Sequence, residues 1–377
     1  MHTHASRAAE AELALQMDVL ESAQLIRAFR LMHMSRRIDD REILLKRQNR
    51  IFFQVSAAGH EAIQVAAGMA TRPGHDWFYL YYRDRGIALA LGVTPLDMFL
   101  QAVGAAEDTA SGGRQMPSHW SSPELHIVTG SSPTGTQFLQ AAGCAQASSY
   151  INPGSDEITL VSAGEGATSE GEFWESINIA CLERLPLLYL IQDNGFAISV
   201  PAEKQTPGGN ISALLKGFPS LLRLEVDGTD FVASYSALSE AAAYCRARKG
   251  PALVHAHVTR PYSHSLSDDE RLYKTAAERA EEAKRDPLVL YPKWLRDEGL
   301  IDQHGLERIG QEIDREIQEV TERAVKAEPP ARGSALRFLY SEKADPTSSE
   351  FETPASLTGE PRTMVDEINL TLHEEMR

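Results

Sequence analysis

The amino-acid sequence predicts an α/β fold in which a mainly parallel sheet carries helices on both faces. Strand patterns at 158–163 and 187–192 flank a helix pattern at 171–184, and this order of elements forms a βαβ unit. A second alternation of strand, helix and strand follows in 221–260 and extends the same sheet. Together the two blocks favour parallel strands joined by right-handed crossovers.

Helical and linker segments flank this central part. Residues 19–48 have apolar positions at helical spacing with charges between them, which predicts one or two amphipathic helices. Residues 109–137 show neither periodicity, and an irregular stretch of this length in a compact domain is usually functional or disordered. We expect an N-terminal helical segment, the α/β domain, a linker rich in Pro, Ser, Thr and Glu, and a C-terminal helix, in residues 1–50, 51–335, 336–362 and 363–377 respectively.

The charge and cysteine content argue against several classes of protein. With 37 Lys and Arg residues against 53 Asp and Glu, the net charge is −16, which argues against a nucleic-acid partner or an anionic membrane surface. No stretch reaches the roughly 18 uninterrupted apolar residues that a membrane helix needs. Cys144, Cys181 and Cys245 are widely separated and have no metal-binding spacing, so we expect reduced thiols in a cytoplasmic protein.

An oxygen-bearing side chain follows each of the two strands of the βαβ unit. Glu165, between Gly164 and Gly166, follows the first strand, and Asn194 follows the second. Because parallel strands end at the same edge of a sheet, neighbouring strands would place these side chains about 5 Å apart. They could share one hard cation such as Mg²⁺, with a backbone carbonyl from around Phe196 as a third ligand.

The same turn suits a phosphate group. Gly164 and Gly166 permit close backbone approach, and Ala167, Thr168 and Ser169 precede a predicted helix whose free N–H groups face the same place. Carboxylate, amide, magnesium and diphosphate therefore form one self-consistent site. Taken singly, each motif could equally be an ordinary turn at the end of a strand.

This combination resembles the thiamine diphosphate motif, which begins Gly-Asp/Glu-Gly and ends in Asn. Here Gly164-Glu165-Gly166-Ala167 is followed by Asn194, 29 residues after Glu165. The surrounding sequence, "GEGATSEGEFWESINIACLERLPLLYLIQDNGFAIS", resembles the α chain of thiamine-dependent 2-oxo acid dehydrogenases, the decarboxylating component of the pyruvate and branched-chain complexes. The resemblance covers most of the chain and implies the thiamine diphosphate-binding fold.

The resemblance implies ligands for the metal and the diphosphate. Glu165, Asn194 and the carbonyl of Phe196 would bind Mg²⁺, while Gly166 and Ala167 would donate hydrogen bonds to the diphosphate.

Three side chains are implied in catalysis, namely Tyr82, Ser132 and His264. The stretch "YYRD" resembles the family's Tyr-Arg pair, so Arg83 would clamp the diphosphate, for which a guanidinium is well shaped. His264, in "RPYSHSLSDD", would lie over the diphosphate and the reacting carbon. The full set of implied cofactor contacts is Tyr82, Arg83, Ser132, Thr134, Gly164, Glu165, Gly166, Ala167, Asn194, Phe196, Ala197 and His264.

The segment around His264 admits a second interpretation. Ser267 and Glu270 fit a capping box, so this segment could simply begin a helix. In the family interpretation Arg260 would orient the loop, and Ser265 lies where mitochondrial relatives are phosphorylated, although no kinase is implied.

Two further stretches match the family. "GSSPTGTQ" resembles a segment that holds the centre of the cofactor and, in some relatives, a potassium ion, for which Ser131, Pro133, Thr136 and Gln137 would offer the oxygens. "GGRQMPSHW" is closer to the branched-chain type and makes His119 a candidate for the substrate channel.

Three positions depart from the family pattern. Asp193 stands where the family often has Asn and adds a negative charge near the metal. Gln192 replaces an Arg of branched-chain relatives and so removes a cation from the diphosphate, and Thr134 replaces a Leu, which leaves the size of the substrate open.

The implied function is oxidative decarboxylation of a 2-oxo acid, with a branched-chain acid favoured over pyruvate, followed by acyl transfer to the lipoyl group of an acyltransferase. In this family a β chain supplies the glutamate that activates the cofactor, so we expect this chain alone to be inactive. The final helix, "TMVDEINLTLHEEMR", resembles the first helix of a β chain and suggests an α/β fusion. An α2β2 assembly or a fused dimer would result.

Two other functions compete with this one. A nicotinamide-dependent dehydrogenase would need G-x-G-x-x-G, but Ser169 stands at the third glycine. A non-catalytic assembly or regulatory subunit could keep the same fold, although Glu165, Asn194, Arg83 and His264 are all present.

Overall fold

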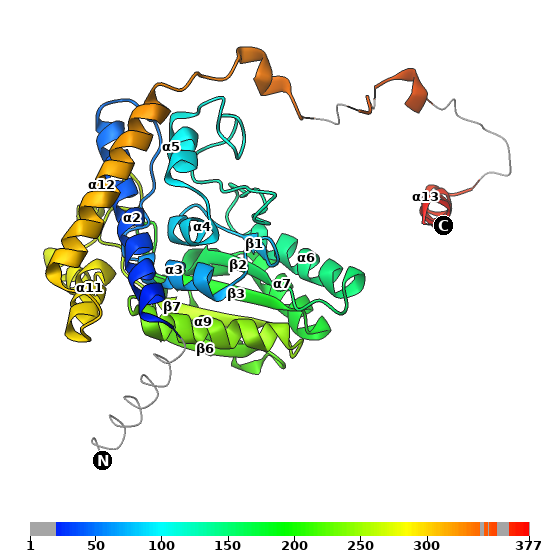
Figure 1. The fold of residues 1–377 in the computed structure, drawn as a ribbon. Coiled ribbons are helices and arrows are strands. Elements are labelled where there is room, and N and C mark those ends of the chain that lie inside the picture. Colours follow the sequence, from blue (N-terminus) through cyan, green and yellow to red (C-terminus); the bar gives the residue numbers. More distant parts are fainter. Residues whose placement is uncertain (1–19, 340–342, 346, 353–361, 377) are drawn as a thin grey trace. The chain divides into compact units, whose positions relative to one another are not determined.

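The computed structural model describes residues 20–339, 343–345, 347–352 and 362–376 (Figure 1). The chain divides into two compact units, Met1–Pro330 and Ala331–Arg377. The predicted sites all lie in the first unit.

A parallel sheet forms the centre of the first unit. Its strand order is β1-β2-β3-β7-β6, and every neighbouring pair is parallel. The prediction of an α/β fold with a mainly parallel sheet is therefore confirmed. The strands are β1 Trp77–Tyr79, β2 Thr159–Gly164, β3 Leu187–Asp193, β6 Leu222–Asp227 and β7 Ala252–His257, with a separate antiparallel pair formed by β4 Phe196–Ala197 and β5 Val200–Pro201.

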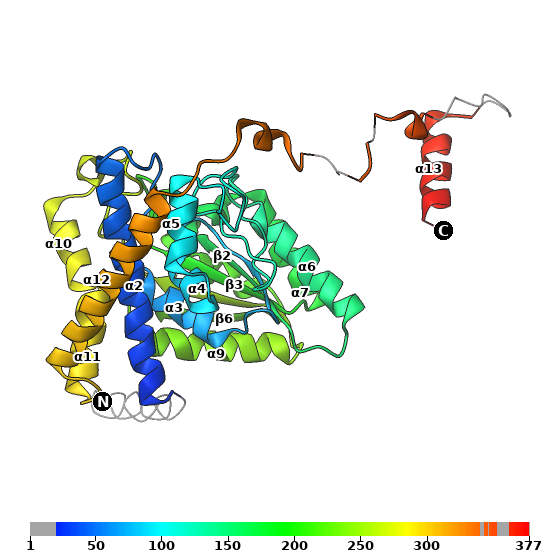
Figure 2. The ribbon, with the colours of Figure 1, turned by 45° about the horizontal axis from the view of Figure 1, so that its top comes forward.

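Helices cover both faces of this sheet, because successive side chains of a buried strand point to opposite sides. In β3, Leu188 and Leu190 belong to one hydrophobic cluster, while Leu187, Tyr189 and Ile191 belong to the other. Figure 2 shows the strands between the two helical layers. The first layer contains α2 Ser22–Arg47, α3 Glu61–Ala70, α4 Arg85–Leu91, α5 Pro95–Val103, α9 Phe231–Arg246, α11 Pro287–Asp297 and α12 Gln303–Val325; the second contains α6 Gln137–Ile151, α7 Gly171–Glu183 and α8 Ile211–Leu214.

The N-terminal helical pattern forms a single helix, α2, which packs against α3, α4, α11 and α12. Buried ion pairs reinforce this packing. Arg36 donates to Glu61 at 2.7 Å and to Asp286 at 2.9 Å, and Arg85 pairs with Asp39 and Glu42. The first part of the predicted segment 1–50 lies outside the described residues.

The irregular stretch at 109–137 is confirmed as a long connection between α5 and α6. Within it the described backbone forms only isolated bridges, which join Ile127 to Phe78 and to Ser122. Glycines with positive φ, Gly112, Gly113 and Gly135, allow its turns. This connection brings Ser131–Thr134 to the carboxyl edge of the sheet.

Among the described residues, the remaining α-helices are α10 Ala276–Lys284 and, in the second unit, α13 Met364–Glu375. Thr363 caps α13 through a capping box with Asp366, and the apolar side chains of α13 are exposed. Much of the predicted linker lies outside the described residues. Across the described parts of the chain, we find no helix with the length and apolar character needed to span a bilayer.

Candidate active site

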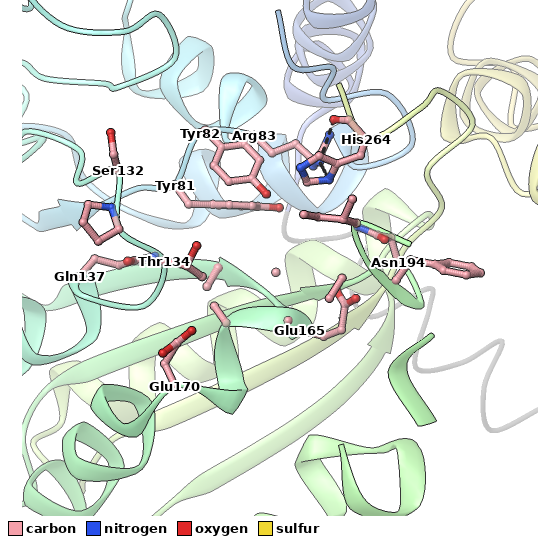
Figure 3. Close-up of a pocket in the computed structure, with 18 of the residues that line it drawn as sticks. Tyr81, Tyr82, Arg83, Ser132, Thr134, Gln137, Glu165, Glu170, Asn194 and His264 are labelled. Carbon is pink, nitrogen blue, oxygen red and sulfur yellow. Dashed lines mark hydrogen bonds between the residues drawn. The ribbon is translucent and has the colours of Figure 1, made fainter. Parts of the chain in front are cut away.

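A cavity of about 320 Å³ opens at the carboxyl edge of β2 and β3 (Figure 3). This is the edge at which open parallel sheets bind ligands. Every residue predicted for the cofactor, the metal ions or catalysis lines it except Thr136. The lining residues are Tyr81, Tyr82, Arg83, Ser131, Ser132, Pro133, Thr134, Gln137, Ala163, Gly164, Glu165, Gly166, Ala167, Glu170, Asn194, Phe196, Ala197, Ile198 and His264.

Glu165 and Asn194 bring two unpaired oxygens to this cavity. Gly164 of β2 is in register with Gln192 of β3, so the neighbouring strand ends carry both side chains to the same place. Glu165 Oε1 and Asn194 Oδ1 are buried and have no hydrogen-bond partner in the described structure. Burial, together with the charge of Asp193, raises the pKa of Glu165 to about 7. Two buried oxygens without donors fit the binding of a hard cation such as Mg²⁺.

A chain of buried side chains orients the amide of Asn194. Its Nδ2 lies 3.4 Å from Nε2 of His60, whose Nδ1 lies 2.9 Å from Oε1 of Gln192. The Gln192 amide in turn donates to Asp84 at 2.7 Å and to Ser162 at 2.8 Å. Because those bonds fix which end of Gln192 accepts, His60 carries its proton on Nδ1 and accepts on Nε2. Asn194 Oδ1 is thereby left for the cavity.

The turn after β2 is tight. Glu165–Ser169 form a short 3₁₀ helix, and α7 begins at Gly171, where the helix pattern at 171–184 predicted its start. A Cβ at Gly166 would lie 2.8 Å from Cβ of Ala197, so a larger residue would push the two turns apart. Because Gly164 and Gly166 have no side chain, their backbone lines the cavity directly.

Arg83 and His264 form the opposite wall of the cavity, beside Tyr82 (Figure 3). Nη2 of Arg83 lies 3.4 Å from both Nδ1 and the carbonyl oxygen of His264. The Tyr82 ring packs under the guanidinium at 5.4 Å and against the His264 ring at 6.1 Å. Burial, with Arg83 and Arg260 nearby, lowers the pKa of His264 to about 4, so this imidazole is neutral near pH 7.

The segment after β7 does not begin a helix at Ser267. Asp269, not Ser267, caps the 3₁₀ helix Glu270–Leu272, and Ser267 instead bonds to Ser265 at 2.9 Å. The capping-box interpretation is therefore wrong. Arg260 is buried and donates to the Ile198 carbonyl at 2.8 Å, which links this segment to the turn after β3.

Comparisons with known proteins place the chain in a family. Residues 29–332 match the model of the family described as "Dehydrogenase E1 component". The chain belongs to the dehydrogenase E1 component family. This family depends on thiamine diphosphate, so the predicted family, fold and enzyme class are confirmed.

Curated members of the family are similar over most of the chain. The 2-oxoisovalerate dehydrogenase subunit alpha of Bacillus subtilis (strain 168) is 36% identical over 323 residues, which cover 85% of this chain and 96% of that protein. The 3-methyl-2-oxobutanoate dehydrogenase subunit alpha of Mycobacterium tuberculosis (strain CDC 1551 / Oshkosh) is 34% identical over 74% of this chain and 73% of its own length. The pyruvate dehydrogenase E1 component subunit alpha of Mycoplasma pneumoniae (strain ATCC 29342 / M129 / Subtype 1) is 31% identical over 87% of each chain.

Of the three positions that depart from the E1 pattern, Gln192 and Asp193 point to opposite faces of the sheet. Gln192 is fully buried toward α3, among the hydrogen-bonded side chains that orient Asn194. Asp193 faces the other way, where it accepts from Nε2 of His255 at 2.9 Å and from the backbone N–H of Gly195 at 2.8 Å. Thr134 lines the cavity.

The predicted potassium segment gathers several oxygens. The Thr136 hydroxyl donates to Oγ of Ser131 at 2.6 Å and lies 3.1 Å from the Pro133 carbonyl oxygen. Gln137 begins α6 and donates its side-chain amide to the Ser162 carbonyl at 3.2 Å. Oγ of Ser132 is hydrogen-bonded to Nε2 of His119 at 2.6 Å. This bond connects His119, the residue predicted for the substrate channel, to the cavity.

Sequence reasoning missed several residues of the site. Tyr81, Glu170 and Ile198 line the cavity, and His60 sets the orientation of Asn194. The aromatic run ending in Tyr82 was a signal for Tyr81. Nothing in the local sequence marks His60, because its partners are 132 and 134 residues away.

Proposed function

We propose that this chain is the α chain of a thiamine diphosphate- and Mg²⁺-dependent 2-oxo acid dehydrogenase. It decarboxylates a branched-chain 2-oxo acid, with pyruvate the next candidate, and passes the acyl group to the lipoyl group of a separate acyltransferase. Membership of the dehydrogenase E1 component family supports the reaction class. The names of the relatives from Bacillus and Mycobacterium support a branched-chain substrate, and that of the Mycoplasma relative supports pyruvate.

The unpaired buried oxygens of Glu165 and Asn194 are the observation that carries the cofactor assignment. Burying polar oxygens without donors is unfavourable, and a cation removes that penalty. With the Phe196 carbonyl as a third protein ligand, diphosphate oxygens and water would complete the six-oxygen shell that Mg²⁺ prefers. The backbone at Gly164, Gly166, Ala167 and Ala197 would lie along the diphosphate.

The side chains of the cavity would each take one part of the work. When bound, thiamine diphosphate supplies a carbon nucleophile for the 2-oxo group and accepts the electrons left when carbon dioxide departs. Arg83 would neutralise the diphosphate, and Tyr82 holds its guanidinium in place. His264, neutral near pH 7, would exchange a proton with the reacting group, while Ser132 and Thr134 would contact the cofactor and the substrate side.

A β chain is required in this proposal. Glu165 cannot activate the cofactor while its carboxylate binds Mg²⁺, and Glu170, the other carboxylate among the described lining residues, is exposed to solvent. We assign the activating glutamate to a β chain, either separate in an α2β2 assembly or fused through the helix that contains Met364–Glu375. Free Cys144, Cys181 and Cys245 fit a reducing compartment such as the cytoplasm.

A potassium ion at Ser131, Pro133, Thr136 and Gln137 completes the proposed site. The Thr136 hydroxyl already lies 2.6 Å from Oγ of Ser131 and 3.1 Å from the Pro133 carbonyl oxygen. Such an ion would fix the loop that carries Ser132 and Thr134.

The test uses this chain reconstituted with a β chain, thiamine diphosphate and Mg²⁺. Carbon dioxide release is measured with branched-chain 2-oxo acids, pyruvate and 2-oxoglutarate, and the highest kcat/KM is expected for a branched-chain acid. The chain without its partner should release none. His264→Ala should retain bound cofactor, measured by calorimetry, but lose acyl transfer to a lipoyl domain. Cofactor binding without turnover of any 2-oxo acid would contradict the proposal.

A further inference from the structure

A second group of metal-ligand side chains lies on the sheet face away from α3, beyond the residues used by the proposed reaction. Asp193 at the end of β3 and His255 and His257 of β7 present ligand atoms that all lie within 4.8 Å of one another. The pairing of Asp193 with His257, and the spacing of two residues between the histidines, put all three on one face. They continue the buried rows of Ile191 and Leu253 past the end of the hydrophobic cluster.

Three atoms of this group are arranged for one ion. Oδ2 of Asp193 lies 2.9 Å from Nε2 of His255 and 3.8 Å from Nδ1 of His257. A tetrahedral ion with bonds of about 2.0–2.1 Å holds its ligand atoms about 3.3 Å apart, and the two distances from Asp193 Oδ2 lie within about half an ångström of that value. Asp193 and His255 are buried, whereas the His257 side chain is 40% exposed and leaves an entry from solvent.

Glu225 of β6 lies behind the two imidazoles. Its Oε1 is 2.7 Å from Nε2 of His257 and 3.9 Å from Nδ1 of His255. Histidines that bind metals commonly donate their other ring N–H to a carboxylate in this way. Nδ1 of His255 is buried and has no hydrogen-bond partner. Binding an ion through Nε2 would move the proton to Nδ1, which could then donate to Glu225.

We infer that Asp193, His255 and His257 form a second metal site for a divalent transition ion of the Zn²⁺ class, with Glu225 supporting both histidines. Two imidazoles and one carboxylate suit Zn²⁺ and disfavour Mg²⁺, which prefers oxygen ligands. The site is separate from the one at Glu165 and Asn194, because the Asp193 side chain contacts His255 while the Asn194 side chain contacts His60. Since Asp193 also accepts from Gly195 N–H at 2.8 Å, a bound ion would hold the turn that carries Asn194.

The experiment titrates Zn²⁺ into the full chain, reconstituted with its β chain and saturated with Mg²⁺ and thiamine diphosphate, against a competing chromogenic chelator. One Zn²⁺ per α chain is expected. His257→Gln and Asp193→Asn should each weaken binding at least 10-fold, and Glu225→Gln should weaken it about 10-fold, as removal of a supporting carboxylate does elsewhere. Circular dichroism checks the fold of each variant.

His75 offers a matched control. Its Nε2 lies 2.7 Å from Asp156, and both side chains are exposed, but the pair has no second imidazole. His75→Gln should leave Zn²⁺ affinity unchanged. Absence of tight Zn²⁺ binding by the wild type, or equal affinity in the His257→Gln and Asp193→Asn variants, would overturn the assignment. With Co²⁺ as the probe, a thiolate charge-transfer band would place the ion on a cysteine and overturn it as well.

Discussion

Buried carboxylates lie beside the two ends of strand β2, and their hydrogen-bond partners differ. At the amino end, Asp76 accepts from the backbone N–H of Ile158, the residue before β2, at 3.1 Å. It also accepts from both terminal nitrogens of Arg246, at 2.8 and 2.6 Å, and from the N–H of Arg72 at 2.7 Å. Both Asp76 oxygens are therefore paired within the protein.

At the carboxyl end, Glu165 is almost as deeply buried but differs in its partners. Its Oε1 has none, and neither does Oδ1 of Asn194 beside it. A buried carboxylate with a bidentate arginine stabilises the fold, whereas the unpaired Oε1 of Glu165 fits the metal ion that we propose there. Burial alone therefore does not distinguish a structural acid from a ligand-binding acid; the hydrogen-bond partners do.

The largest expected effect tests the amino end. Asp76→Ala leaves the Arg246 guanidinium and two backbone N–H groups without their acceptor. Breaking a buried ion pair destabilises proteins by about 3–5 kcal/mol, and we expect a loss of that size in the free energy of unfolding. Urea unfolding of the chain without cofactor measures this loss. Asp156→Ala at the same edge is the control, because its pairs with Arg72 and His75 are exposed, and it should change stability by about 1 kcal/mol or less. Equal losses in the two variants would refute the contrast.

Glu165→Gln tests the carboxyl end, where we expect a large loss of cofactor affinity and little change in stability. The amide has a similar shape, and Oε1 has no hydrogen bond to lose, so stability without cofactor should change by less than about 1 kcal/mol. Mg²⁺-dependent binding of thiamine diphosphate should weaken at least 100-fold, or by about 2.7 kcal/mol. Calorimetry with the β chain present measures it. Unchanged affinity would refute the metal assignment and, with it, the distinction between the two ends.

Sequence alone could predict the carboxyl end but not the amino end. Glu165 and Asn194 stand beside glycines after recognisable strands, so their proximity followed from the rule that parallel strands end at one edge. Asp76 lies before a short aromatic strand with no motif, and its partner Arg246 is 170 residues away. Nothing local to either residue indicates that they meet.

The same limit applies within the site. The long connection from 109 to 137 was predicted as irregular, yet the bond from Ser132 to His119 depends on how that connection folds back. Gln192 was interpreted as a missing cation for the diphosphate, whereas it is buried among His60, Gln64, Asp84 and Ser162. Which face of a strand a side chain takes depends on register, and a register error of one residue reverses it.

His60 gives a smaller effect that sharpens the comparison, because it acts on the unpaired oxygens only through the orientation of Asn194. His60→Asn can keep a donor for Gln192 but has no acceptor at the position of Nε2, so the Asn194 amide loses its orientation. Mg²⁺ affinity should fall about 10-fold, as for other residues that support metal ligands. His60→Gln can place an oxygen near the former Nε2 and should restore most of the affinity. Equal losses in both variants would show that only packing matters.

The smallest effect concerns pH and His264, on the wall opposite Glu165. Burial and the charges of Arg83 and Arg260 lower the pKa of His264 to about 4 from an ordinary value of 6.5. Below pH 6.5 the imidazole gains a proton in the unfolded chain but not yet in the folded chain. The free energy of unfolding is therefore unaffected by this group above pH 6.5 and falls as the pH drops from about 6.5 to 4. In His264→Gln, the fall in the Tm of the cofactor-free chain over this range should be smaller than in the wild type. Bound diphosphate should raise the pKa of His264 and flatten the wild-type curve in the same way. The measurement compares Tm profiles with and without thiamine diphosphate and Mg²⁺. If the two profiles differ only by a constant offset, the diphosphate does not lie near His264.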